Sequence, residues 1–427
     1  MNKPSKRVVI GLGALFAVSL ITVMALGLSS APNRPEQKLP RVYDAQDPQF
    51  KRVMGSLLGP GIVGGNEIKE LINGDQIFPA MLAAIKGAKG SINFETYIYW
   101  SGDIGKAFAD ALSERAAAGV KVNVLVDWVG SAKMDDDLLN TMRRSGVEIR
   151  KFHKPNWYTF TKLNNRTHRK LLIVDGAVGF TGGVGIAEKW AGRAQDAEHW
   201  RDSHYQVEGP VVAQFQATFL DNWIKETGAV LHSEIYFPPL QSVGKSDAQM
   251  FSSSPASGSD NMGLMYQLAL TAAKVSIDLS MAYFVPDELS SRILIEAMRR
   301  GVKVRIITPG EIIDTQTVRA ASRGTWGPLL SAGAEIYEYQ PTMYHCKVMI
   351  IDDFMVSVGS TNFDDRSFKL NDEANLNIYD AAFAARQTKI FKDDLSKARR
   401  VSLQEWEQRP FKEKAAEVLS GLVRSQL

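Results

Sequence analysis

The sequence is poor in cysteine and in net charge. Among its 427 residues Cys346 is the only cysteine, so no disulfide can form within the chain. Fifty Lys and Arg against 47 Asp and Glu give a formal net charge of +3, too small by itself to indicate a nucleic-acid partner. Cys346 lies between His345 and Lys347, and we expect it to be a small buried residue with no nucleophilic role.

The sequence also lacks the patterns of nucleotide and metal sites. The glycine-rich segment 181–185 has no lysine after it, as a phosphate-binding loop requires. The other histidines, His153, His199, His204 and His232, show no metal-ligand spacing. We therefore expect neither a metal nor a cofactor.

One long uncharged run lies at the N-terminus. Residues 8–28 are long enough to span a bilayer as a helix, and Lys3, Lys6 and Arg7 precede them. This charge bias predicts a single-pass membrane anchor, with the body of the protein on the non-cytoplasmic side. A cleaved signal peptide is the alternative, with a weak cleavage site at residues 29–31.

The remaining chain repeats one series of blocks. Residues 88–93, 117–122 and 144–149 match residues 273–278, 299–304 and 331–336 at near-constant offsets, which indicates an internal duplication. Alternating strand and helix patterns predict an α/β fold with a largely parallel sheet in each half. The predicted organisation is an anchor (1–28), a linker rich in proline and charge (29–54), and two halves (55–240 and 241–427).

Two copies of one pattern carry the candidate chemistry. In each, a histidine stands two residues before a lysine, so both side chains share one face of an extended strand. An apolar run typical of a buried strand follows and ends at an aspartate, whose position favours hydrogen bonds to backbone over contact with substrate. The catalytic candidates are His168, Lys170, Asp175, His345, Lys347 and Asp352.

Imidazole and ammonium groups suit reactions at a phosphate. If equivalent strands meet across a pseudo-twofold axis, His168 and His345 come to one site. One histidine, unprotonated, can then attack phosphorus while the other gives a proton to the leaving group. The lysines would neutralise the phosphate oxygens.

Four further residues complete the predicted site. Each imidazole needs a partner on its second nitrogen, and Asp202 and Glu373 follow the two patterns at comparable distances. We expect each carboxylate to orient the histidine of the opposite half. Ser360 and Asn362 would bind substrate through uncharged hydrogen bonds.

These features resemble the phospholipase D superfamily. His-x-Lys-x4-Asp occurs twice, with Gly-Ser-x-Asn after the second copy, and residues 93–99, 200–204 and 359–367 are similar to bacterial cardiolipin synthases. The likeness covers roughly residues 65–427. It implies two duplicated α-β-α sandwich halves related by a pseudo-twofold axis.

The resemblance also implies a reaction. Phosphatidyl transfer would proceed without metal through a phosphohistidine, with His168 as nucleophile and His345 as general acid. Two phosphatidylglycerols would give cardiolipin and glycerol at a membrane, with no nucleic-acid partner. The alternatives are a phospholipase that releases phosphatidic acid with water as acceptor, a nuclease, and a lipid-binding scaffold without activity. The acceptor alcohol and the oligomeric state stay open.

One segment departs from the superfamily pattern. The first copy has Gly182-Gly183-Val184-Gly185 where Gly-Ser-x-Asn is expected. The first half therefore supplies fewer polar contacts, and the missing side chains would leave room for a bulkier substrate. Two other segments have expected positions: the aromatic loop 155–162 at the membrane interface or as a lid, and the apolar face of the C-terminal helix (Ala415, Val418, Leu419, Leu422 and Val423) against the body.

Overall fold

The computed structural model describes residues 39–154, 164–254, 261–421 and Gln426. By its contacts the chain divides into two units, one comprising residues 1–38 and 155–163 and the other the remaining residues. The predicted anchor and aromatic loop thus lie outside the described residues. Among the residues described, no helix is both long and apolar enough to cross a bilayer.

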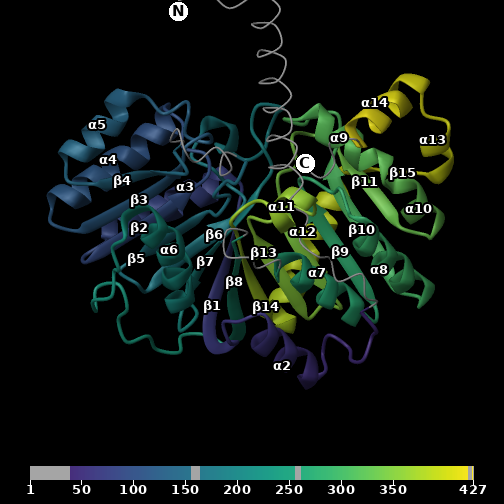
Figure 1. Ribbon diagram of the computed structural model, residues 1–427, viewed down its shortest axis with the longest axis horizontal. Helices are drawn as coiled ribbons and strands as arrows, with labels where there is room; N and C mark the ends of the chain where they lie inside the picture. Colours follow the sequence, from purple (N-terminus) through teal and green to yellow (C-terminus); the bar gives the residue numbers. More distant parts are fainter. Residues whose placement is uncertain (1–38, 155–163, 255–260, 422–425, 427) are drawn as a thin grey trace, which may run out of the picture. The chain divides into compact units, whose positions relative to one another are not determined.

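In the described part of the chain the strands form one fifteen-stranded sheet (Figure 1). Its order is β15-β11-β10-β9-β12-β13-β14-β8-β1-β7-β6-β5-β2-β3-β4. In chain order the strands are β1 (Val63–Ile72), β2 (Ser91–Thr96), β3 (Lys121–Asp127), β4 (Glu148–Phe152), β5 (Leu171–Val174), β6 (Val178–Gly182), β7 (Ser203–Glu208), β8 (Ser246–Ser253), β9 (Ser276–Met281), β10 (Lys303–Pro309), β11 (Glu335–Tyr339), β12 (Lys347–Ile351), β13 (Met355–Gly359), β14 (Glu373–Tyr379) and β15 (Ala398–Val401).

The strand order repeats on either side of the central pair β8 and β1. From β1 outward the strands are β7, β6, β5, β2, β3 and β4, and from β8 outward they are β14, β13, β12, β9, β10 and β11, followed by β15. Strands with matching sequence blocks, such as β2 and β9, hold corresponding places. The repeat in sequence therefore has a counterpart in the sheet.

The prediction of a largely parallel sheet is wrong. Among the described strands, parallel pairs occur only within β2-β3-β4 and β9-β10-β11, and the other neighbouring strands pair antiparallel. Parallel neighbours need a crossover, which α4 (Asp103–Ala117) and α5 (Asp136–Arg144) provide in the first group. In the second group α8 (Glu288–Arg299), α9 (Gln316–Gly324) and α10 (Trp326–Ser331) provide it. Short turns join β5 to β6 and β12 to β13, and such turns connect antiparallel strands.

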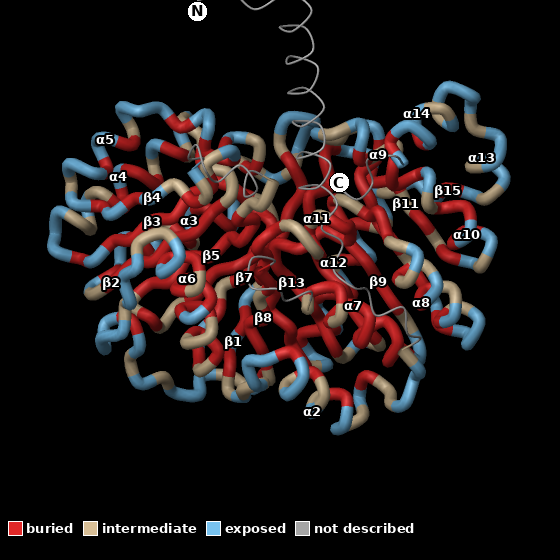
Figure 2. The backbone as a smooth tube through the Cα atoms, viewed as in Figure 1, coloured by how far each residue is buried: buried red, intermediate tan, exposed pale blue. Residues whose placement is uncertain are grey.

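Helices cover both faces of the sheet, and buried residues follow the strands between them (Figure 2). α3, α4 and α5 pack on the first half, α7, α8 and α10 on the second, and α6 and α12 contribute to a third core that draws on both halves. The helices are α2 (Pro48–Leu57), α3 (Gly74–Gly87), α4 (Asp103–Ala117), α5 (Asp136–Arg144), α6 (Val212–Thr227), α7 (Asn261–Ala272), α8 (Glu288–Arg299), α9 (Gln316–Gly324), α10 (Trp326–Ser331), α11 (Asp365–Lys369), α12 (Ala381–Leu395), α13 (Leu403–Glu407) and α14 (Phe411–Gly421).

Helix α2 begins inside the predicted linker, residues 29–54. Phe50 and Met54 are fully buried in the core of the second half. Pro48 occupies the first helical turn, and the Asp47 side chain caps the helix. Proline and charged residues suggested a linker here, but the same residue types also occur where helices begin.

Helix α14 does not pack by the predicted face. Val418 and Leu419 are 70% and 66% exposed, whereas Glu417 and Ser420 are buried. The Glu417 carboxylate accepts two hydrogen bonds from Arg409 at 2.7 and 2.5 Å, which keeps the polar side of the helix inward. The apolar side therefore faces outward.

Candidate active site

Each histidine lies in an extended segment directly before a buried strand, β5 or β12. The main-chain N–H of His168 donates to the Asp372 carbonyl at 2.9 Å, and that of His345 donates to the Arg201 carbonyl at 2.8 Å. Both acceptors belong to the opposite half, and each directly precedes a predicted carboxylate. The backbone thus brings each imidazole beside a carboxylate of the other half.

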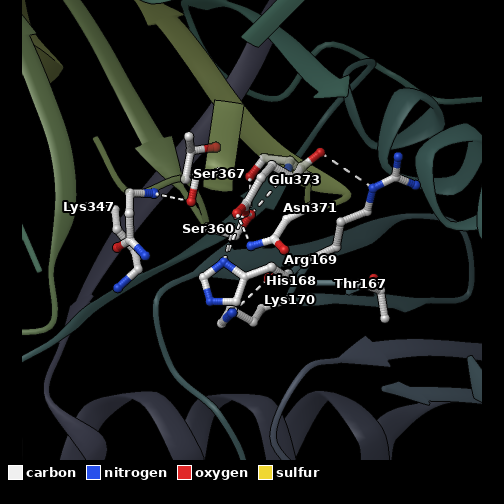
Figure 3. Close-up of polar contacts among 12 residues, drawn as sticks. Thr167, His168, Arg169, Lys170, Lys347, Ser360, Ser367, Asn371 and Glu373 are labelled. Atoms are coloured by element: carbon white, nitrogen blue, oxygen red, sulfur yellow. Dashed lines mark hydrogen bonds and ion pairs between the residues drawn. The ribbon is translucent and has the colours of Figure 1, made fainter. Parts of the chain in front are cut away.

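The side chains complete this exchange between halves. His168 Nδ1 lies 2.9 Å from Glu373 Oε1, and His345 Nδ1 lies 2.7 Å from Asp202 Oδ2. Figure 3 shows His168 and Glu373 pointing toward each other. The predicted cross-pairing is therefore confirmed. Among the described residues His168 Nε2 makes no hydrogen bond, whereas His345 Nε2 lies 3.2 Å from Lys347 Nζ.

Burial lowers the pKa of both imidazoles, which favours their neutral forms in the free protein. It lowers the pKa of His168 to about 4, against the opposing effect of Glu373 and with a further lowering by Lys170. The pKa of His345 is lowered by burial and then by Lys347, against its own carboxylate partner. A neutral ring whose Nδ1–H is donated to a carboxylate has its lone pair on Nε2.

The two lysines lie under their histidines. Lys170 Nζ donates to the His168 carbonyl at 2.6 Å, and Lys347 Nζ donates to the His345 carbonyl at 2.8 Å. Burial lowers the pKa of Lys170 to about 7 and also lowers that of Lys347. A nearby anion would therefore stabilise the charged form of both lysines.

Ser360 and Asn362 have different surroundings. Ser360 is fully buried and does not line the cavity; its hydroxyl donates to Glu373 Oε2 at 2.5 Å. Asn362 lines the cavity, and among the described residues its Oδ1 has no hydrogen-bond partner. Asn362 thus lies where a substrate contact was predicted, whereas Ser360 holds a carboxylate.

The two motif aspartates, counted among the catalytic candidates, lie away from the cavity. Asp175 accepts hydrogen bonds from the backbone N–H groups of residues 89–91, and Asp352 accepts from those of residues 274–276. Neither lines the cavity that contains the histidines. Counting them among the catalytic candidates is therefore corrected: both carboxylates bind backbone at the strand ends, as their positions in the sequence suggested.

The glycines of the first half leave no empty space. Trp190 Nε1 donates to Asp202 Oδ2 at 2.9 Å, in the role that Ser360 has toward Glu373. A Cβ at Gly183 would come within 2.2 Å of Asp202 Oδ1, and one at Gly185 would come within 3.1 Å of the Trp190 ring. The expected room for a bulkier substrate is therefore absent, because an indole fills it.

Both histidines open into one cavity of about 690 Å³. Its wall near His168 includes Tyr97, whose ring lies edge-on to the imidazole at 5.2 Å. Its wall near His345 is aromatic, since Trp190 and Trp200 lie 5.3 and 5.5 Å from that ring. An apolar wall beside polar groups fits a ligand with both a headgroup and a lipid portion.

The sequence interpretation missed several cavity residues. Trp190, Arg166 and Arg366 line the cavity but received no role. Arg366 follows Asn362 closely and Arg166 stands two residues before His168, so their positions in the motifs were the available signal. A lone arginine or tryptophan near a motif does not reveal which way it points.

Two further observations concern the chemistry of the site. In the described part of the chain, no three His, Cys, Asp or Glu side chains are grouped to hold a metal ion. Cys346 is buried, and burial raises the pKa of its thiol to about 12, which confirms the prediction of a small buried residue.

Known proteins share this sequence and fold. Residues 81–223 and 267–395 match the family model described as cardiolipin synthase, PLD-like domain. The chain is 34% identical over 365 residues to cardiolipin synthase 1 of Bacillus anthracis, covering 83% of this chain and 71% of that protein. It is 33% identical over 355 residues to cardiolipin synthase A of Pseudomonas putida, covering 83% and 74%. The crystal structure of phosphatidylserine synthase from Haemophilus influenzae, 14% identical, matches with a TM-score of 0.68 over 89% of this chain and 100% of that one, which shows a shared fold.

Proposed function

The chain belongs to the cardiolipin synthase family of phospholipase D-like proteins, and we propose that it condenses two phosphatidylglycerols into cardiolipin and glycerol. It is a phosphatidyltransferase of the phospholipase D type. The observation that carries the proposal is the pair of imidazoles that open into one cavity, each fixed through Nδ1 by a carboxylate of the opposite half.

In the first step, His168 Nε2 attacks the phosphorus of one phosphatidylglycerol. The bond from phosphorus to the glycerol oxygen breaks as the nitrogen–phosphorus bond forms. His345, protonated in the complex because the bound anion favours its charged form, gives its proton to the departing oxygen, and glycerol leaves. Burial lowers the pKa of His345 as well, so the order of the two histidines follows the resemblance to the family and not their pKa values.

In the second step, a hydroxyl group of another phosphatidylglycerol attacks the phosphohistidine. His345, now neutral, takes the hydroxyl proton, and the nitrogen–phosphorus bond breaks. Cardiolipin forms and both histidines return to their starting states. Lys170, Lys347 and Asn362 would hold the non-bridging oxygens, whose charge is stabilised in both transition states.

The membrane setting of this reaction belongs to the same proposal. The relatives are bacterial cardiolipin synthases, and we infer that this protein works at a bacterial inner membrane. We also propose that residues 8–28 form a single-pass anchor, with the catalytic body on the non-cytoplasmic side.

The strand order repeated about β8 and β1 supports two halves related by a pseudo-twofold axis.

The test is purified full chain in mixed micelles of detergent and phosphatidylglycerol. We expect cardiolipin and glycerol in equal amounts, and neither from His168→Ala or His345→Ala, because each step needs both imidazoles. Phosphatidic acid as the sole lipid product would identify a hydrolase. Full activity in either variant would rule out the paired mechanism.

A further inference from the structure

Two arginines on the wall of the cavity have no acidic partner. Arg166 and Arg366 both line the cavity that contains His168. Among the described residues, neither forms an ion pair with Asp or Glu. Other enclosed arginines of the same protein differ in this respect. Each of Arg305, Arg319 and Arg323 forms an ion pair with a buried carboxylate.

The hydrogen bonds of the two arginines go to neutral groups. Arg366 donates to the Gln426 carbonyl at 2.8 Å, to the Asn164 carbonyl at 3.1 Å and to Asn164 Oδ1 at 3.0 Å. Arg166 donates to the Asn165 carbonyl at 3.0 Å. These bonds orient the guanidinium groups without neutralising their charge.

The two guanidinium groups also act on one another. Burial lowers the pKa of Arg366, Arg166 lowers it further, and Asp364 opposes both. Burial raises the pKa of the Asp364 carboxyl to about 7, and that carboxyl accepts a hydrogen bond from the Ser367 N–H at the start of α11. Asp127 also acts on Arg166, and Asp314 lines the same cavity. None of these carboxylates forms an ion pair with either guanidinium among the described residues, so both guanidinium groups can still pair with an added anion.

The proposed reaction requires a second anion-binding site. The phosphate of the donor lipid occupies the space between the histidines. An acceptor phosphatidylglycerol brings a phosphate of its own, which must lie elsewhere in the same cavity while the glycerol hydroxyl reaches the phosphohistidine. Guanidinium groups bind phosphate through paired, charge-assisted hydrogen bonds.

We propose that Arg166 and Arg366 together bind the phosphate of the acceptor phospholipid. This assignment rests on the proposed function, whose acceptor it specifies. Tyr97, whose ring lies 5.2 Å from that of His168, lines the same cavity as both arginines. The pair therefore favours an acceptor that carries a phosphodiester over water or a neutral alcohol.

The test compares charged and neutral acceptors that share one glycerol unit. Radiolabelled glycerol exchanges into phosphatidylglycerol through the same phosphohistidine but carries no phosphate. Glycerol phosphate is the soluble anionic acceptor, and phosphatidylglycerol is the lipid one. In Arg166→Gln and Arg366→Gln we expect kcat/KM for both anionic acceptors to fall about 10- to 100-fold, with glycerol exchange within about twofold of the unmodified protein.

Arg300→Gln provides the matched control. Arg300 also donates only to backbone carbonyls, those of Thr271 and Ala273, and it does not line the cavity. We expect this variant to handle all three acceptors as the unmodified protein does. Arg300 is exposed, so this variant reports whether losing a guanidinium that bonds only to backbone affects turnover from outside the cavity.

The outcomes separate this assignment from the proposed function. An equal loss of kcat/KM with glycerol and with glycerol phosphate would overturn the assignment, because Arg166 and Arg366 would then bind the donor lipid or stabilise the fold. Another result would refute the synthase function while supporting the anion site. In that case the unmodified protein makes no cardiolipin but prefers glycerol phosphate to glycerol, and both variants lose this preference. Glycerol phosphate titrations followed by tryptophan fluorescence give the binding readout without turnover, and unchanged affinity in both variants would also overturn the assignment.

Discussion

At the scale of single residues, the two carboxylates of the site are held by unlike donors. Glu373 accepts from the hydroxyl of Ser360, and Asp202 accepts from the indole of Trp190. Both bonds favour the ionised carboxylate, whose pKa stays below its usual range despite burial. Each charged carboxylate in turn supports the protonated form of its histidine, so these donors influence proton transfer without touching substrate.

The variant Trp190→Phe isolates the indole N–H. The ring is kept, but Asp202 loses the bond measured at 2.9 Å, and we expect kcat to fall about 10- to 100-fold because His345 is less well oriented and less easily protonated. Trp200→Phe is the control, since Trp200 also lies against His345 but its indole makes no hydrogen bond to Asp202. Rapid-quench measurement of phosphohistidine formation reads the step directly, and equal losses in both variants would contradict the role of the N–H.

The pKa of His168 predicts the acid limb of the pH profile. A pKa lowered to about 4 means that the free enzyme keeps a neutral nucleophile down to that pH, so kcat/KM should fall only as the pH approaches 4. Glu373 opposes the lowering, and Glu373→Gln should therefore move the limb to still lower pH while reducing kcat. The glycerol-exchange rate measured from pH 3.5 to 8 checks this, and a limb near the unperturbed value of about 6.5 would refute it.

Apart from Ser360 and Asn362, the site residues predicted from the sequence have a counterpart in both copies. His168 and His345 could be found because spacing and repetition mark them, and their carboxylates because they recur at comparable distances. Trp190 could not be found, since the sequence shows only that Ser and Asn are missing and not that an indole from the following segment fills their place. Asp175 and Asp352 show the reverse, because a repeated residue can serve the strand end in both halves.

At the scale of elements, local signals predicted most helices and strands but not how the strands pair. β5 and β12 are buried at every residue, in agreement with their apolar runs. The direction of pairing depends on connections. Asp175-Gly176 between β5 and β6 is a hairpin signal that the prediction of a parallel sheet did not use, and Asp352-Asp353 between β12 and β13 is a weaker one. α14 differs for another reason, because its bonds to Arg409 outweigh the burial of Val418 and Leu419.

Helix α2 tests whether the segment before the first half belongs to the fold. Phe50 is fully buried on this helix, and Phe50→Ala should lower the free energy of unfolding by about 3–5 kcal/mol through lost burial and a residual cavity. Ser56, exposed on the same helix, supplies the control, and Ser56→Ala should stay within about 0.5 kcal/mol. Urea unfolding in detergent measures both, and equal midpoints would mean that α2 is dispensable.

At the scale of the whole body, the two halves share a core and a site. One apolar cluster joins Val212 and Phe219 of α6 with Ile350 of β12 and Phe383 of α12. The histidine–carboxylate pairs cross between halves in both directions, so neither half can form a complete site by itself. The body should therefore unfold as one cooperative unit even though its sequence is duplicated.

A buried ion pair between the halves makes this testable. Arg201, just before β7, donates to both carboxylate oxygens of Asp394 on α12 at 2.9 and 2.7 Å, and the two side chains are 4% and 2% exposed. Asp394→Asn leaves a buried guanidinium without a counter-charge, which costs about 3–5 kcal/mol. Because the Arg201 carbonyl also accepts the His345 N–H, turnover should fall as well.

The neighbouring Asp393 gives the comparison. It is 66% exposed and pairs with Lys397 at 2.7 Å, so Asp393→Asn should change the free energy of unfolding by less than about 1 kcal/mol. Calorimetry of both variants should show one transition, displaced to lower temperature only in Asp394→Asn. Two separate transitions, with only one displaced, would mean that the halves fold independently and that the shared core does not couple them.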